Sequence, residues 1–96
     1  MKRVDVYMLI DEERNYQERK WGENKINSIE EWLVYIEDYI NEAKHIVSRD
    51  VKENTAHRCM WNIRKIAAMA ICAMEQYDTM SRKQEETYKS CLDDEA

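Results

Sequence analysis

The clearest hydrophobic pattern of the chain predicts a helix over residues 28–49. Its apolar positions recur at helical spacing and comprise Ile29, Trp32, Leu33, Ile36, Ile40, Ala43 and Val47. Ser28 and Glu31 form a capping-box pair, in which each side chain satisfies a free backbone N–H at the helix start. When Tyr35, Tyr39 and Ile46 are added, the apolar arc spans nearly half the circumference. So wide an arc indicates burial against a second surface, such as another subunit.

A second strong pattern predicts a helix over residues 55–77. Its centre, from Ile66 to Met74, is apolar on all sides, which is typical of a helix surrounded by protein. A chain of 96 residues has little material with which to surround one of its own helices. We therefore expect a homo-oligomer, most simply a dimer in which the second and third helices of two copies form a four-helix core.

The remaining segments are less sharply defined. Residues 4–20 favour a helix, although Val4, Val6, Met8 and Ile10 alternate as in a strand. Gly22 is the natural stop of this helix and opens a loop over residues 21–27. The polar tail, residues 79–96, is expected to form a fourth helix or to fray. The pattern as a whole predicts one all-α domain over residues 1–96, with three to four helices.

Composition narrows the function classes. The chain has no proline and one glycine, which disfavours strand-rich folds. Its net charge of −5 is mixed along the sequence, so no basic face for duplex nucleic acid is expected. Three cysteines without CxxC spacing indicate reduced thiols in a cytoplasmic protein. The longest apolar run is too short to cross a bilayer, and we expect no membrane association.

Three stretches of the chain together resemble a known family. Residues 13–22 (ERNYQERKWG) are similar to the ERxxQxxKWG opening of small, often phage-encoded MazG-like proteins. Residues 31–33 (EWL) match the start of the acidic helix of that group, and residues 66–75 (IAAMAICAME) resemble its VAAVAVAxxE helix. The resemblance covers residues 11–77. It implies an all-α dimer or tetramer that cleaves nucleoside triphosphates to monophosphate and pyrophosphate with Mg²⁺ or Mn²⁺.

The metal-binding motifs of that family are degenerate in this chain. The resemblance places the EExxE motif on Asp38, Tyr39 and Glu42, and the ExxD motif on Asn62 and Lys65. Hard divalent cations need a cluster of oxygen ligands, and of these positions only Asp38 and Glu42 still carry a carboxylate. These two acids are the candidate metal ligands. Lys65 instead brings a positive charge, which either pairs with one of the two acids or contacts a ligand.

The helix over residues 55–77 carries a polar stripe of a different kind. Arg58, Asn62, Lys65 and Gln76 lie within about 60° of one another around the helix axis. An ammonium and a guanidinium can hold phosphate oxygens without a metal. Tyr16 and Trp21 are positioned either to stack on a base or to close the end of the bundle. The candidate ligand-binding residues are Tyr16, Lys20, Trp21, Tyr39, Arg58, Asn62, Arg64 and Lys65, with Arg64 reaching in from a neighbouring subunit.

These observations lead to three hypotheses of function. The first is a non-catalytic nucleotide-binding protein without a cofactor, such as a phage protein that sequesters a host nucleotide signal. The second is a Mg²⁺- or Mn²⁺-dependent pyrophosphohydrolase that combines Asp38 and Glu42 with Glu13 or Glu18. The third is a protein-interaction module in which the pocket is closed. A ligand bound to the purified protein distinguishes the first two hypotheses from the third.

Overall fold

The computed structural model describes residues 1–22, 26–49 and 55–94, which form four helices and no strand. The helices are α1 (Arg3–Trp21), α2 (Ile29–Arg49), α3 (Thr55–Tyr77) and α4 (Arg82–Asp94). The all-α prediction is therefore confirmed, and the first three helices lie within one residue of the predicted ranges. The polar tail forms α4. Residues 23–25 of the predicted loop and residues 95–96 of the tail lie outside the described ranges.

Local sequence signals account for the helix ends. Gly22 ends α1 with a φ of 88° that side chains disfavour, and its N–H donates to the carbonyl of Glu18 over 2.8 Å. The capping box at α2 has Ser28 N donating to Glu31 Oε1 at 2.9 Å and Glu31 N donating to Ser28 Oγ at 3.1 Å. Ser81 and Gln84 make the same reciprocal pair at the start of α4.

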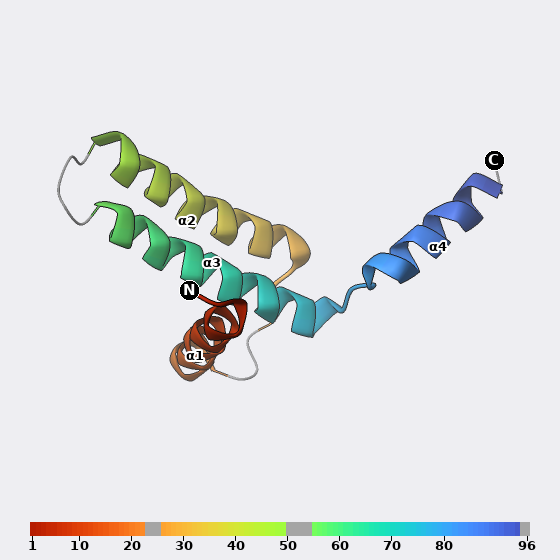
Figure 1. The fold of residues 1–96 in the computed structure, drawn as a ribbon, viewed down its shortest axis with the longest axis horizontal. Helices are drawn as coiled ribbons and strands as arrows, with labels where there is room; N and C mark the ends of the chain where they lie inside the picture. The colour runs from red at the N-terminus through yellow and green to blue at the C-terminus, as the bar shows by residue number, and fades with distance from the viewer. Residues whose placement is uncertain (23–25, 50–54, 95–96) are drawn as a thin grey trace.

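Helix α3 is the centre of the fold. Both α1 and α2 pack on it, and within the described ranges the backbones of α1 and α2 do not come close to each other. In Figure 1, α2 runs antiparallel beside α3 while α1 crosses it, and α4 extends away from the other three helices. Among the described residues, no helix combines the length and apolar character that a membrane crossing requires.

The hydrophobic core is small. Trp32, Met69 and Cys72 form a buried cluster. Trp21 and Tyr39 pack against this cluster from α1 and α2, together with Ile36 and Ala73. The core therefore joins all three packed helices at the end of the body where α1 stops and α2 starts.

Polar residues attach α1 to α3. Glu13 and Gln17 are the buried residues of α1, with exposed fractions of 8% and 3%. Glu13 Oε1 accepts from Arg64 Nε at 2.6 Å, and Gln17 Nε2 donates to the carbonyl of Lys65 at 3.1 Å. The apolar residues at the start of α1, including Val4 and Met8, are exposed instead. The strand-like alternation of these residues therefore has no counterpart in the structure.

Arg14 adds an ion pair to the same contact. Its Nη2 lies 2.7 Å from Glu75 Oε2 on α3 and 3.9 Å from Glu18 Oε1 on α1. Burial by itself lowers the pKa of the guanidinium. The hydrogen bond to Glu75 and the charges of Cys72, Glu75 and Glu18 outweigh this effect and raise the pKa above its usual value. Arg14 therefore stays charged at neutral pH.

The described structure leaves much apolar surface uncovered. The sequence pattern predicts that the centre of α3, from Ile66 to Met74, is surrounded by protein; within the single chain Ala68, Met69 and Cys72 are buried, whereas Met74 at its end is 52% exposed. The wide apolar arc of α2 is likewise only partly covered, since Ile29, Leu33 and Val47 are exposed while Trp32 is buried. A single chain therefore covers only part of the apolar surface of these helices.

The buried amide of Gln17 is expected to contribute measurably to stability. Gln17→Ala removes the hydrogen bond to α3 and leaves a small cavity, so we expect a loss of about 1–2 kcal/mol in the free energy of unfolding. The control is Asn15→Ala, at an exposed position of the same helix, which we expect to change stability by less than about 0.5 kcal/mol. Urea unfolding followed by circular dichroism measures both. Equal effects of the two substitutions would contradict a role for Gln17 in the contact between α1 and α3.

Candidate functional site

Two cavities lie in the space between α1 and α2, and we call the two together the groove. On one side of α3, Gln17 of α1 donates to the carbonyl of Lys65. On the other side, Asn62 Nδ2 donates to the carbonyl of Tyr39 on α2 at 3.2 Å. Of the polar stripe predicted from helical spacing, Lys65 lies between these two contacts and Asn62 makes one of them. The groove therefore forms because α1 and α2 attach to separate sides of α3.

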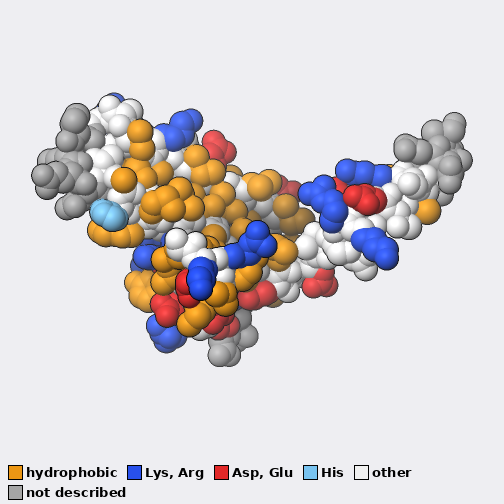
Figure 2. All heavy atoms as spheres, in the orientation of Figure 1, with side chains coloured by type: hydrophobic (Ala, Val, Ile, Leu, Met, Phe, Trp, Pro, Cys, Tyr) orange, Lys and Arg blue, Asp and Glu red, His pale blue; other side chains and the backbone are white. Residues whose placement is uncertain are grey.

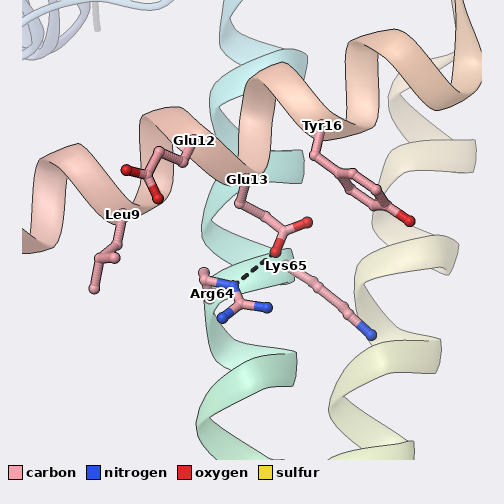
Figure 3. Close-up of a pocket in the computed structure, with 6 residues that line it drawn as sticks. All are labelled: Leu9, Glu12, Glu13, Tyr16, Arg64 and Lys65. Atoms are coloured by element: carbon pink, nitrogen blue, oxygen red, sulfur yellow. Dashed lines mark hydrogen bonds and ion pairs between the residues drawn. The ribbon is translucent and has the colours of Figure 1, made fainter.

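The part of the groove beside α1 is a cavity of about 350 Å³, which we call the Lys65 cavity. Its lining consists of Leu9, Glu12, Glu13, Tyr16, Arg64 and Lys65. Figure 3 shows the side chain of Lys65 extending from α3 toward α2, while Tyr16 leans over the same space from α1. Arg64 is held against Glu13 by the ion pair described above. Tyr16, Arg64 and Lys65, three of the predicted ligand-binding residues, thus share one cavity.

The part of the groove beside α2 is a second cavity of about 380 Å³, which we call the aromatic cavity. Four aromatic side chains and two polar residues line it, namely Trp21, Asn27, Trp32, Tyr35, Asp38 and Tyr39. The ammonium of Lys65 lies 5.7 Å from the centre of the Tyr39 ring, within the range of a cation–π contact. Lys65 therefore stands between the two cavities.

The positions equated with the family's metal motifs do meet in space. Tyr39 contacts both Asn62 and Lys65, so the central position of the first motif lies against both positions of the second. Asn62 is 3% exposed and uses its amide to hold α2 on α3. Its role in this structure is therefore to position the helices, although it was predicted as a ligand-binding residue.

Other predicted residues lie outside the two cavities. Arg58 is in the first turn of α3, almost two turns before Lys65, and lines neither cavity. Lys20 places its ammonium 5.9 Å from the centre of the Tyr16 ring, on exposed surface of α1. Arg64 was expected to reach into a neighbouring subunit. In this chain it is paired with Glu13 of its own α1.

The two remaining acids do not form a cluster. Asp38 lines the aromatic cavity, whereas Glu42, one turn later, is exposed and lines neither cavity. Across residues 1–22, 26–49 and 55–94, no three His, Cys, Asp or Glu side chains gather as metal ligands would. Within these residues, neither Asp38 nor Glu42 forms an ion pair with Lys65. The ammonium of Lys65 contacts the Tyr39 ring instead. Two carboxylates from one helix are too few donors for the oxygen shell of Mg²⁺.

Several residues of the site were not predicted from the sequence. Tyr35 and Trp32 were assigned to the apolar arc of α2, but both line the aromatic cavity. Their spacing from Tyr39, four and seven residues, places all three on one helical face, which is the signal that was available. Gln76 was assigned to the polar stripe. Its Oε1 accepts from Trp32 Nε1 at 3.0 Å and from the backbone N–H of Asn27 at 3.4 Å, so it anchors the cavity wall.

A smaller polar cavity adjoins the aromatic cavity. It has a volume of about 20 Å³ and shares Trp21, Asn27 and Trp32 with its neighbour. Gln17 also lines it, and the Oε1 atom of Gln17 is the one buried side-chain oxygen or nitrogen in the described residues that has no hydrogen-bond partner. The volume is close to that of a single water molecule, which is too small for a base or a phosphate.

Cys72, which also lines this small cavity, is suited to packing rather than to chemistry. Burial raises the pKa of its thiol. The positive charge of Arg14 lowers this pKa, the negative charges of Glu75 and Glu18 raise it, and the net result is a raised pKa. A nucleophilic or metal-binding cysteine needs the opposite shift, because the thiolate is the reactive form. The thiol of Cys72 therefore remains protonated at neutral pH.

No protein-family model, curated protein or solved structure matches this chain. The resemblance to the MazG-like group therefore depends on the three sequence stretches given above.

The raised pKa of Cys72 predicts a specific dependence of stability on pH. In the unfolded chain the thiol ionises near its usual pKa of 9.0, below the value in the folded state. The contribution of the protonated Cys72 thiol to the free energy of unfolding is fully present below pH 9.0. It is lost as the pH rises through the pKa of the folded state, because the thiol of the unfolded chain releases its proton at a lower pH. Unfolding free energies of the wild type and Cys72→Ala, measured across this range, should therefore converge as the pH rises. A constant difference between the two proteins would contradict the shift.

Proposed function

We propose that this protein binds a nucleotide in the groove between α1 and α2 without hydrolysing it. The observation that carries the proposal is the position of Lys65. Its ammonium stands between a cavity lined by four aromatic side chains and a second open cavity, and no carboxylate of the described residues pairs with it. A base and a phosphate need these two environments side by side, namely aromatic faces and a cation.

The aromatic cavity suits the base. Its volume falls within the usual range of small-molecule sites, and Trp21 and Tyr35 offer ring faces for stacking. Asp38, in the same lining, offers an acceptor for the N–H groups on the edge of a base. Aromatic walls with a few polar groups are the common composition of such sites. The predicted stacking role of Trp21 is thus compatible with its packing against the core cluster.

The charges of the groove favour a ligand with few phosphates. Lys65 and Arg64 contribute two positive charges, while Glu12, Glu13 and Asp38 contribute three negative charges, which leaves a net charge of −1. Arg64 is also neutralised by Glu13. A triphosphate without its metal would meet net repulsion here, whereas one phosphate needs only Lys65. We therefore propose a monophosphate or a cyclic nucleotide as the ligand class.

The enzyme alternative has little support in the groove. It requires acids beyond Asp38 and Glu42, and both acids offered for that purpose are already engaged. Glu13 is buried in its pair with Arg64, and Glu18 lies 3.9 Å from Arg14. The resemblance to phage-encoded MazG-like proteins supports a protein that holds a host nucleotide signal and does not consume it. No metal cofactor is required for that role.

Catalysis is tested by pyrophosphate release. With nucleoside triphosphates and Mg²⁺ or Mn²⁺, we expect no release above the uncatalysed level, because Tyr39, Asn62 and Lys65 occupy positions where the family carries acids. Turnover at ordinary enzymatic rates that is lost in Asp38→Asn would instead establish the enzyme alternative. Pyrophosphate release is measured in the Glu42→Gln variant as well, and loss of turnover there would equally support the enzyme alternative.

Ligand binding is tested first by mass spectrometry of small molecules released from the purified protein by heat, and then by calorimetry with nucleoside monophosphates of each base. Lys65→Ala removes one charge-assisted phosphate contact, so we expect affinity to fall roughly ten- to a hundredfold, or about 1.5–3 kcal/mol. The melting temperature should stay near that of the wild type, because Lys65 has no ion-pair partner in the described structure.

The matched control for this variant is Lys44→Ala. Lys44 is an exposed lysine of α2 that lines neither cavity. We expect it to leave affinity within about twofold of the wild type. A lower melting temperature for Lys65→Ala with unchanged affinity would show that Lys65 is structural, and the absence of any binding would leave the interaction-module hypothesis.

A further inference from the structure

The aromatic cavity contains two polar residues, Asp38 and Asn27, whose side chains the fold does not use. The carboxylate of Asp38 forms no ion pair or hydrogen bond with any described residue. The side-chain amide of Asn27 forms none either, although Asn27 is only 6% exposed. Polar groups at so buried a position are normally hydrogen-bonded. The cavity therefore offers an unused carboxylate and an unused amide to a ligand.

The backbone of Asn27 is fixed by the last turns of α3. Its N–H donates to Gln76 Oε1 at 3.4 Å, and its carbonyl accepts from the Tyr77 hydroxyl at 2.5 Å. The same Gln76 oxygen accepts from the indole N–H of Trp32, another wall of the cavity. Because this backbone is already held in place, using the amide costs only the ordering of one short side chain.

Asp38 belongs to the same face of α2 as two of the aromatic rings. It follows Tyr35 by three residues, which makes the two side chains neighbours on the helix surface, and it directly precedes Tyr39. Asp38 itself is exposed. A base that stacks on a ring keeps its hydrogen-bonding groups at its edge, where the rings do not satisfy them. In this cavity, the groups available to that edge are those of Asp38 and Asn27.

A carboxylate distinguishes the bases because it only accepts hydrogen bonds. Guanine presents a ring N–H and an amino group side by side, so the two oxygens of a carboxylate can accept from both. Adenine and cytosine place a ring nitrogen with a lone pair beside their amino group, and uracil has its ring N–H between two carbonyl oxygens. These lone pairs repel the second oxygen of a carboxylate. Asp38 therefore fits guanine better than the other bases.

The other groups of the site contribute little to this choice. The amide of Asn27 both donates and accepts, so it can serve the acceptors of guanine or an edge of adenine. On the face shown in Figure 2, Lys and Arg side chains are interspersed with Asp and Glu, and hydrophobic side chains gather over α2, α3 and the start of α1. Such a mixed surface attracts nucleotides without regard to their base. Selection between bases therefore depends on Asp38.

We propose that the aromatic cavity selects guanine. Asp38 accepts from the ring N–H and the amino group of the base, Asn27 serves one of its remaining polar atoms, and the phosphate lies at Lys65. The ligand is then a guanine nucleotide with a single phosphate. This inference rests on the nucleotide binding proposed above, and it adds which base is bound and which residue selects it.

Calorimetry with guanosine, inosine and adenosine monophosphates tests the choice of base. Guanosine monophosphate should bind roughly tenfold or more tightly than adenosine monophosphate, because adenine forfeits one charge-assisted hydrogen bond and adds a repulsion. Inosine monophosphate keeps the ring N–H but lacks the amino group, so its affinity should lie between the two.

The possible failures are distinguishable in the same experiment. Equal affinities for the three nucleotides, or tighter binding of adenosine monophosphate, would overturn the selection of guanine and leave nucleotide binding in the groove intact. If none of the three binds, nucleotide binding itself is overturned, and the selection of guanine with it.

The role of Asp38 is tested by Asp38→Asn, which replaces one acceptor by an N–H donor at nearly the same shape. We expect affinity for guanosine monophosphate to fall roughly tenfold or more, and affinity for adenosine monophosphate to stay within about threefold or to rise. The matched control is Glu37→Gln, which removes the same charge from the neighbouring exposed residue of α2, outside both cavities. It should leave both affinities within about twofold.

Two results with these variants would overturn the assignment to Asp38. One is an equal change in affinity for both nucleotides in Asp38→Asn, which would show that Asp38 acts on the phosphate or on the fold. The other is the same effect in Asp38→Asn and Glu37→Gln, which would show that only the net charge matters. Circular dichroism of each variant confirms that the helices are retained.

Discussion

The contact on which the rest of the structure depends is the polar attachment of α1 to α3. Glu13, Arg14 and Gln17 lie along one side of α1 and meet an arginine, a glutamate and a backbone carbonyl of α3. Hydrogen bonds and ion pairs have strict geometry, so this contact holds α1 in one rotation and one register against α3. It keeps α1 separate from α2, and the space between the two helices is the groove. Residues 13–22, which resemble the opening of the MazG-like sequences, thus determine the shape of the groove through their contacts with α3.

The fold was predictable where local rules decide it. The capping box at Ser28, the stop at Gly22 and the 3.6-residue periodicity of α2 and α3 each act within a few residues, and each is present in the structure. The docking of α1 was not predictable, because its buried residues are Glu13 and Gln17. A method that looks for apolar stripes cannot recognise a helix that is held by its polar side. The same limitation explains why the start of α1 resembled a strand.

The candidate site was predictable as a helical face, but the partners of its residues were not. Angular position around α3 identified Lys65 and Asn62 as neighbours, and both lie toward the groove. Sequence alone did not show that Asn62 would turn to the backbone of Tyr39, or that Arg64 would pair with Glu13. Such choices depend on the relative position of two helices, which follows from contacts far apart along the chain. The expected pairing of Lys65 with Asp38 or Glu42 is absent from the described residues for the same reason.

Different sides of α3 therefore have different roles. One side of α3 accepts α1 through polar groups, another packs on α2, and Lys65 lies between them at the two cavities. The remaining side is apolar, and the depression beside it, lined by Met60, Ile63 and Ala67, shares Leu9 and Arg64 with the Lys65 cavity. Helix α3 also supplies most of the buried apolar residues of the described structure, namely Cys59, Ala68, Met69 and Cys72, so the positions of α1 and α2 both depend on it.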